Sequence, residues 1–199
     1  KIVLIPNGVD EAKFIPGDKR KFKAELGIDG GRKVVLFLAQ GGTDNVWKGG
    51  EYFKELYRSY QDKGWLWIAI GGNKEVIRGD YWELKYLDSE ETKAKYLAVA
   101  DVFVYPSVAD NCPLVVLEAM SCGVPILTFN VGGLPELVVH KKTGYVANYK
   151  DQNDLEKGFN LIMSEKGVAL DLGREARLRV ENNYTLKQMV DSYIHLYSE

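Results

Sequence analysis

The chain has 199 residues and a mass of 22.4 kDa, which is the size of one medium domain. Hydrophobic residues make up 46% and charged residues 27%, so a disordered chain and a fibrous repeat are excluded. The formal net charge of -2 also argues against a dedicated nucleic-acid-binding protein. An anionic ligand must therefore be held by local groups.

Two further features of the sequence indicate where the protein works. No apolar run approaches the roughly 18 residues that a membrane span needs, and the first residues lack a signal-peptide pattern, so we expect a cytoplasmic protein without a transmembrane segment. Cys112 and Cys122 lack CxxC spacing and histidines are few, so we expect free thiols and no metal site. The chain starts with Lys1 inside an apolar segment, which is typical of a fragment of a longer protein.

Short apolar runs alternate with segments of helical periodicity. In chain order we expect strand 34–39, helix 49–63, strand 66–70, helix 89–100, strand 102–105, helix 113–122, strand 125–129, strand 144–147, and helices 151–164, 168–182 and 186–197. Apolar strands separated by helices are typical of a parallel sheet covered on both faces. We therefore predict an α/β fold with a doubly wound, Rossmann-like parallel sheet over residues 1–199.

Local signals mark the ends of several helices. Asp88 followed by Glu91 is a capping-box pattern, Gly123 is a stop signal after helix 113–122, and Thr185 is a cap for the last helix. In a doubly wound sheet, ligands bind outside the carboxyl ends of the strands. The loops that follow the strands are therefore the candidate sites.

The loop and helix after strand 102–105 are the most informative segment. Pro113 suits the first helical turn, and the free N–H groups of Leu114 and Val115 form an anion site with the helix dipole, most naturally for a phosphate. Glu118 is the only ionisable residue of this apolar helix and needs a partner, either ligand hydroxyls such as a ribose or a lysine or arginine from elsewhere. Asp110 either reaches a second ligand group or serves as a turn residue.

Two glycine-rich loops also follow strands. Lys48 lies in the first loop, which lacks the Walker A and GxGxxG spacings and is either a phosphate clamp or a surface turn with a solvated lysine. The second loop offers consecutive amides and a carboxylate that can line a polar pocket. The candidate residues of the two loops, besides Lys48, are Gly41, Gly42, Gly132, Gly133 and Glu136.

Several separated motifs, in this order, resemble the C-terminal half of family-4 glycosyltransferases. They are Lys48-Gly49, Ala100-Asp101, Pro106-Ser107, Asp110 with Glu118 eight residues on, the segment Glu118-Ala119-Met120-Ser121-Cys122-Gly123-Val124-Pro125, and Gly132-Gly133 with Glu136. The resemblance implies a GT-B architecture of two Rossmann-like domains, of which this chain is the nucleotide-sugar-binding one. Residues 1–16 are then an entry segment from a missing N-terminal domain, and residues 184–199 form the terminal helix.

The resemblance also implies an activity. Members of the family transfer a sugar from a nucleotide-sugar to an acceptor with retention of configuration, usually without a required metal. Lys48 and Asp110 are then the catalytic residues, at the diphosphate and the donor sugar, and Glu118 holds the ribose. The other donor-binding residues would be Gly41, Gly42, Asn111, Cys112, Leu114 and Val115, with Tyr86 and Leu87 beside the base.

The implied substrates follow from the same resemblance. The donor is UDP- or GDP-linked, no cofactor is needed, and the acceptor is a glycan or lipid-linked molecule held by the missing domain, as in polysaccharide biosynthesis. The full-length protein would then work in the cytoplasm or at the inner membrane face, and the isolated domain would turn over poorly.

The chain departs from the family pattern at two positions. Asp110 stands where the family commonly has glutamate, and Gly42 stands where it often has arginine. These departures motivate an alternative, a nucleotide-sugar-binding module without transfer activity. A nucleotide-sugar epimerase is a third alternative, although it requires further acid and base groups that we cannot locate.

Overall fold

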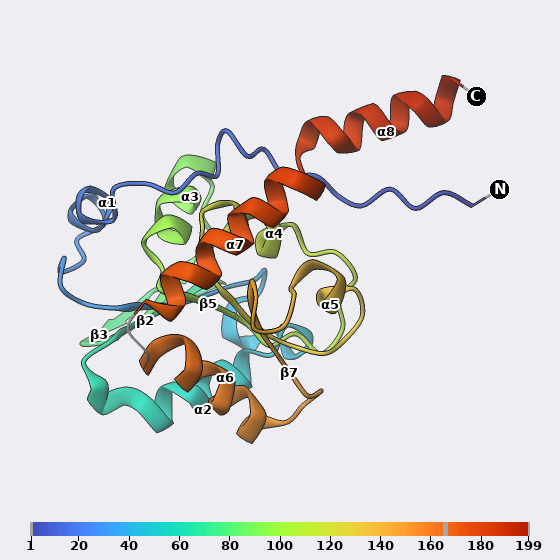
Figure 1. The fold of residues 1–199 in the computed structure, drawn as a ribbon. Helices are drawn as coiled ribbons and strands as arrows, with labels where there is room; N and C mark the ends of the chain where they lie inside the picture. Colours follow the sequence, from blue (N-terminus) through green and yellow to red (C-terminus); the bar gives the residue numbers. More distant parts are fainter. Residues whose placement is uncertain (1, 165–166, 199) are drawn as a thin grey trace.

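The computed structural model describes residues 2–164 and 167–198, and these residues contain a seven-stranded sheet of order β3-β4-β2-β1-β5-β6-β7 (Figure 1). Neighbouring strands are parallel except β3 and β4, which are antiparallel. The strands are β1 (Val34–Leu38), β2 (Leu66–Gly72), β3 (Val76–Arg78), β4 (Tyr81–Lys85), β5 (Val102–Tyr105), β6 (Ile126–Phe129) and β7 (Gly144–Ala147).

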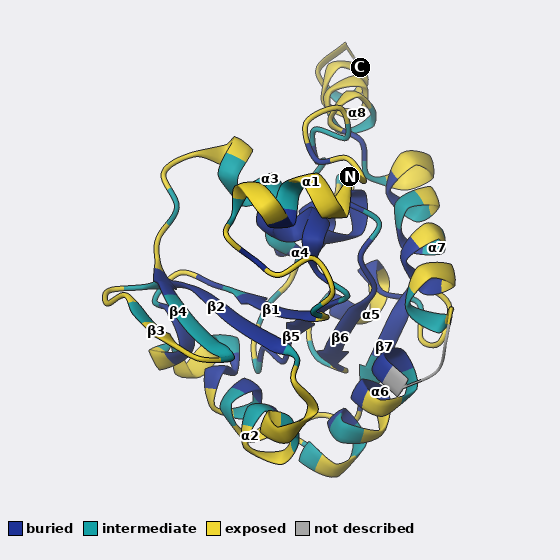
Figure 2. Ribbon diagram, turned by 90° about the vertical axis from the view of Figure 1, so that its left-hand side faces the viewer, coloured by how far each residue is buried: buried dark blue, intermediate teal, exposed yellow. Residues whose placement is uncertain are grey.

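Helices cover both faces of this sheet. Figure 2 shows α1, α3 and α4 on one face and α2 and α6 on the other. The α-helices are α1 (Lys19–Glu25), α2 (Gly50–Tyr60), α3 (Glu90–Val99), α4 (Leu114–Ser121), α5 (Leu134–Leu137), α6 (Gln152–Ser164), α7 (Val168–Asn183) and α8 (Leu186–Ser198). Short 3-10 turns are η1 (Gly42–Asp44), η2 (Val46–Lys48) and η3 (Gln61–Lys63). The predicted doubly wound α/β fold is confirmed.

The central strand shows why the apolar runs predict the sheet so well. β1 pairs in parallel with β2 on one side and with β5 on the other, and its residues Val34 to Phe37 have no exposed surface. Because helices pack on both faces, side chains of both orientations must be apolar. The strand is therefore continuously hydrophobic rather than alternating.

Besides the single-turn helix α5 and the 3-10 turns, three elements were not predicted from the sequence. β3 and β4 form a half-exposed edge hairpin, and α1 is a short charged helix capped by Asp18, whose side chain accepts hydrogen bonds from the N–H groups of Arg20 and Lys21. None of them has the long apolar period on which the prediction depended. The part of the chain that the structure describes contains no helix long and apolar enough to cross a membrane.

One predicted cap is wrong and another is correct. Ser89, not Asp88, caps α3, because the helix begins one residue later and the Ser89 hydroxyl accepts from the Thr92 N–H at 3.2 Å. At the start of α8, Thr185 and Gln188 form reciprocal hydrogen bonds of 3.1 and 2.9 Å. The predicted cap at Thr185 is confirmed.

A partly buried arginine fastens the N-terminal segment to α4 and α7. Arg177 of α7 donates from Nη1 to the carbonyls of Glu11, Phe14 and Ser121 at 2.8 to 3.0 Å, and its Nε pairs with Glu181 at 2.6 Å. The Ser121 hydroxyl also donates to the Phe14 carbonyl at 2.6 Å. The C-terminal end of α4 is thereby fixed to two other segments.

Arg177→Met removes the donor for these carbonyls while keeping the apolar stem. We expect it to lower the free energy of unfolding by about 2–4 kcal/mol, because partly buried carbonyls and a charge partner lose their hydrogen bonds. Urea unfolding measures the change. The control is Arg174→Met, whose side chain is 73% exposed; it should change stability by less than about 0.5 kcal/mol. Equal midpoints for the two variants would show that the Arg177 contacts contribute little.

Candidate functional site

A cavity of about 440 Å³ lies at the carboxyl ends of β1, β2 and β5, where a doubly wound sheet binds its ligands. The N-terminal end of α4 forms part of its wall. Seven of the residues that sequence analysis singled out line it together: Lys48, Tyr86, Leu87, Asp110, Leu114, Val115 and Glu118. The fold therefore brings segments up to 70 positions apart in the chain to one site.

One side of the cavity carries an ion pair with a tyrosine attached to it. Lys48 Nζ lies 2.6 Å from Asp110 Oδ2, and the Tyr105 hydroxyl donates to the same oxygen at 2.8 Å. The Asp110 side chain is only 14% exposed, and its Oδ1 accepts from the Asn111 N–H at 3.0 Å. Burial and then the hydrogen bond to Asp110 raise the pKa of Tyr105 far above its ordinary value, so the hydroxyl stays a donor.

The backbone next to Lys48 approaches the loop after β5 very closely. The Trp47 carbonyl accepts from the Val108 N–H and from the Ser107 hydroxyl, both at 2.9 Å. Gly49 has a φ of 78°, and a Cβ built there would lie 1.9 Å from the Pro106 carbonyl oxygen. Only glycine fits, and this contact fixes where Lys48 enters the cavity.

The other side of the cavity carries a second ion pair. Glu118 Oε1 lies 2.7 Å from Lys93 Nζ, and the two side chains are 11% and 21% exposed. Both residues line the cavity, and Oε2 of Glu118 has no hydrogen-bond partner among the described residues. Glu118 thus has the internal cation that sequence analysis left open, and also an oxygen available to a ligand.

The N-terminal end of α4 lies between the two ion pairs. Its cap, Pro113, provides no side-chain hydrogen bond, and within the described part of the chain the N–H groups of Leu114 and Val115 have no backbone partner. These free donors and the positive end of the helix dipole make this wall suitable for an anion.

Five candidate residues lie elsewhere, in an adjoining cavity of about 510 Å³ formed with residues 4–7: Asn111, Cys112, Gly132, Gly133 and Glu136. The Gly133 N–H donates to the Asp110 carbonyl at 3.1 Å, and a Cβ at Gly132 would lie 1.8 Å from that oxygen. The backbone of the two glycines therefore packs against the Asp110 loop and supports it. Their contact with a ligand stays a prediction.

Gly41 and Gly42 lie in a third, small hollow of about 130 Å³ beside the β2 and β4 ends. The structure does not bring them to the cavity that contains Lys48, although Gln40 next to them lines it. Contact of Gly41 and Gly42 with a donor also stays a prediction.

Two residues of the main cavity escaped sequence analysis. Tyr105 was seen only as the end of a strand, and its place five residues before Asp110 was the one available signal. Lys93 could not be distinguished from the other lysines of the chain, and the need of Glu118 for a cation was the only indication that one of them lies beside it.

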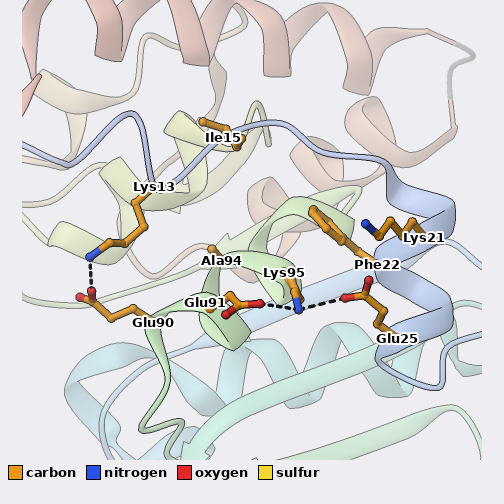
Figure 3. Close-up of a pocket in the computed structure, with 9 residues that line it drawn as sticks. All are labelled: Lys13, Ile15, Lys21, Phe22, Glu25, Glu90, Glu91, Ala94 and Lys95. Carbon is orange, nitrogen blue, oxygen red and sulfur yellow. Dashed lines mark hydrogen bonds and ion pairs between the residues drawn. The ribbon is translucent and has the colours of Figure 1, made fainter.

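A further cavity of about 480 Å³ lies between α1 and α3 and shares no lining residue with the main cavity (Figure 3). Lys13 pairs with Glu90, and Lys95 bridges Glu25 and Glu91 at 2.9 and 2.8 Å. Most of the charged side chains that line this cavity are thus paired with one another. Among the described residues, no group of three or more His, Cys, Asp or Glu side chains is placed to hold a metal ion.

Comparison with solved structures identifies the architecture. The chain matches the C-terminal domain of a glycosyl transferase group 1 family protein (LpcC) from Francisella tularensis with a TM-score of 0.74 and 16% identity, over 90% of this chain and all of that one. It also matches Anabaena Alr3699/HepE, solved with UDP and glucose, with a TM-score of 0.82 and 18% identity, over 99% of this chain and 56% of that one. The fold is that of the C-terminal half of GT-B enzymes.

Residues 18–179 match the family described as glycosyl transferases group 1, and the chain belongs to this family. A curated relative is the D-inositol 3-phosphate glycosyltransferase of Pseudarthrobacter chlorophenolicus, 26% identical over 196 residues. The match covers 92% of this chain and 47% of that protein. The chain spans about half the length of the curated relatives it matches.

The contact at Gly49 yields a prediction with a matched control. Gly49→Ala should lower the free energy of unfolding by about 2–4 kcal/mol, because the methyl group meets the Pro106 carbonyl in a left-handed conformation. Gly64→Ala has a similar φ of 70° but open space, so it should cost only about 1–2 kcal/mol. Chemical denaturation measures both, and equal costs would contradict the role of the close approach.

Proposed function

We propose that this chain is the donor-binding half of a retaining glycosyltransferase and that it holds a nucleoside-diphosphate sugar in the cavity between Lys48 and Glu118. The observation that carries the proposal is the uncapped N-terminal end of α4, which opens on the cavity between two lysine–carboxylate pairs. Free backbone donors, the helix dipole and lysine ammonium groups together suit a diphosphate. The UDP bound to the structurally similar HepE supports the same class of ligand.

The nucleotide has a natural orientation in this cavity. The free Oε2 of Glu118 would accept a hydrogen bond from a ribose hydroxyl, and Leu114 and Val115 would donate to the diphosphate from one turn earlier on the same helix. Tyr86 and Leu87 line the cavity wall and would lie beside the base of a UDP- or GDP-linked donor. The sugar would then lie toward Lys48 and Asp110.

The chemistry follows from charge that develops on the leaving group. As the bond between the sugar and the diphosphate breaks, Lys48 and the α4 amides stabilise the negative charge, and because these groups are already oriented, no reorganisation is needed. Asp110 holds Lys48 in place and also accepts from Tyr105. Both residues would lie beside the donor sugar. An acceptor hydroxyl attacks the sugar from the same face while its proton passes to the departing diphosphate, and attack from this face retains the configuration.

The rest of the enzyme is part of the proposal. The curated relatives are about twice as long as this chain, so a further Rossmann-like domain would hold a glycan or lipid-linked acceptor. The full protein would act in the cytoplasm or at the inner membrane face. The chain by itself would bind donor and transfer little.

A second candidate is a nucleotide-sugar-binding module without transfer activity. It is favoured by one observation, that both Lys48 and Tyr105 already bond to the short Asp110 side chain. A carboxylate engaged in this way has less reach toward a sugar than the longer glutamate common in the family. No observation favours a nucleotide-sugar epimerase.

Glu118→Gln tests the nucleotide site. Calorimetric titration of the chain with UDP, GDP and ADP, and with their sugars, identifies the donor, and Glu118→Gln should weaken its binding by roughly 10- to 100-fold because the ribose loses a charged acceptor. Glu55→Gln, on the exposed face of α2, is the control and should bind as the unaltered chain does. Binding of no nucleotide by the unaltered chain would end the proposal.

Asp110→Asn separates transfer from binding. In the protein that carries both halves, we expect donor consumption to fall by about 100-fold, since Lys48 loses its charged partner next to the sugar, while donor affinity changes by less than about threefold. Steady-state rates with a titration of the same variant measure the two effects. Equal turnover would remove Asp110 from catalysis, and a parent protein that binds donor without consuming it would favour the binding module.

A further inference from the structure

The position where related enzymes often carry an arginine is closed to any side chain in this protein. Gly42 has a φ of 59°, and a Cβ built there would lie 2.7 Å from both N and Cα of Gly72. Because both contacts are with backbone atoms, no side chain fits without a shift of the strand end. Gly42 also faces the small hollow beside β4 rather than the cavity with Lys48. A second cation for a diphosphate must come from elsewhere in the chain.

The cavity wall contains one such cation in the described residues, Lys93 of α3. Its ammonium lies 2.7 Å from Glu118 Oε1 and 5.0 Å from the centre of the Phe14 ring. An ammonium has three donor hydrogens, and the hydrogen bond to Glu118 uses one of them. The ammonium therefore keeps donors for a ligand in the cavity that it lines.

The charge of the cavity also requires this lysine. Its charged lining residues are Lys48, Lys93, Asp110 and Glu118, whose charges cancel. Without Lys93 the wall would carry a net negative charge, which repels a nucleoside diphosphate at close range. The dipole of α4 supplies only about half an elementary charge, too little to reverse that balance.

The geometry brings Lys93 close to the free amides. Leu114 and Glu118 stand one turn apart on the same side of α4, with a rise of about 6 Å between them. A diphosphate bound to the Leu114 and Val115 N–H groups would therefore lie on the same side of α4 as the Lys93 ammonium at Glu118, in the cavity that all four residues line. Lys48 would approach the same anion from the opposite wall.

We infer that Lys93 is the second cation of the nucleotide site and that it binds the diphosphate in place of a side chain at position 42. This inference rests on the proposed function and deepens it. Lys93 pairs with Glu118, and its remaining donors would bond to a phosphate oxygen while Glu118 accepts from the ribose. The nucleotide then lies between two lysines that come from different elements, η2 and α3.

The test compares a nucleoside diphosphate with its parent nucleoside. Ligand-observed NMR titration of the 199-residue chain gives affinities for UDP and uridine, or for GDP and guanosine if the guanine nucleotide is the one bound. Lys93→Met should weaken the diphosphate by roughly 10- to 100-fold and the nucleoside by less than about threefold. Lys93→Arg, which keeps the charge, should restore most of the diphosphate affinity.

Two further variants make the outcome decisive. Lys95→Met alters the next lysine of α3, which pairs with Glu25 and Glu91 outside the site, and should change neither affinity. Lys93→Met combined with Glu118→Gln should keep the low ratio of diphosphate to nucleoside affinity. If the double variant recovers the ratio of diphosphate to nucleoside affinity, Lys93 only neutralises Glu118. If Lys93→Met weakens the diphosphate and the nucleoside equally, Lys93 only positions Glu118. Either result overturns the inference. If the unaltered chain binds neither diphosphate, the proposed function itself fails.

Discussion

The N-terminal end of α4 is the feature on which the site depends. The helix is fixed at its far end, where Arg177 and the Ser121 hydroxyl connect it to residues 11–14 and to α7. Its near end is left without a side-chain cap, directly after the loop that carries Asp110. A helix that is anchored at one end and open at the other presents free N–H groups in a constant position. Such donors suit an anion whose charge increases during a reaction, because they do not have to move.

Both lysines of the cavity are held by carboxylates from the same short stretch of chain. Asp110 precedes α4 and holds Lys48, and Glu118 lies within it and holds Lys93. This arrangement keeps two cations in the wall of the cavity near the uncapped end of α4 without leaving their charges unpaired. Because each carboxylate holds one lysine, the short distance between the two carboxylates along the chain brings together two lysines that are 45 residues apart in the sequence.

Much of the fold was predictable because its strands are buried on both faces. The runs at β1, β2, β5, β6 and β7 were recognised from continuous apolar sequence, since the packing of helices on both sides requires it. β3 and β4 escaped because they are short and half-exposed, and the cap of α3 was placed one residue early. Elements of three to five residues contain too few side chains to establish a hydrophobic period.

The site was predicted in part, for a different physical reason. Loops that follow parallel strands meet at one sheet edge, so Lys48, Asp110 and Glu118 were expected to share a location, and they line one cavity. The partners of these residues were not predictable, because the Glu118 contact with Lys93 and the Asp110 contact with Tyr105 depend on side-chain packing between elements. The glycine pair at 132 and 133 lines a separate cavity, and its backbone also supports the Asp110 loop, a contact that composition did not predict.

The hairpin at the sheet margin has a consequence for the behaviour of the protein in solution. An open parallel sheet ends in unpaired backbone groups, which attract strands of other molecules. Here the last strand, β3, is only three residues long, runs against its neighbour and ends in Arg78. A short antiparallel edge strand that ends in a charged residue offers few backbone groups with which a strand of another molecule can pair. The β3 edge of the sheet is therefore protected against edge-to-edge aggregation.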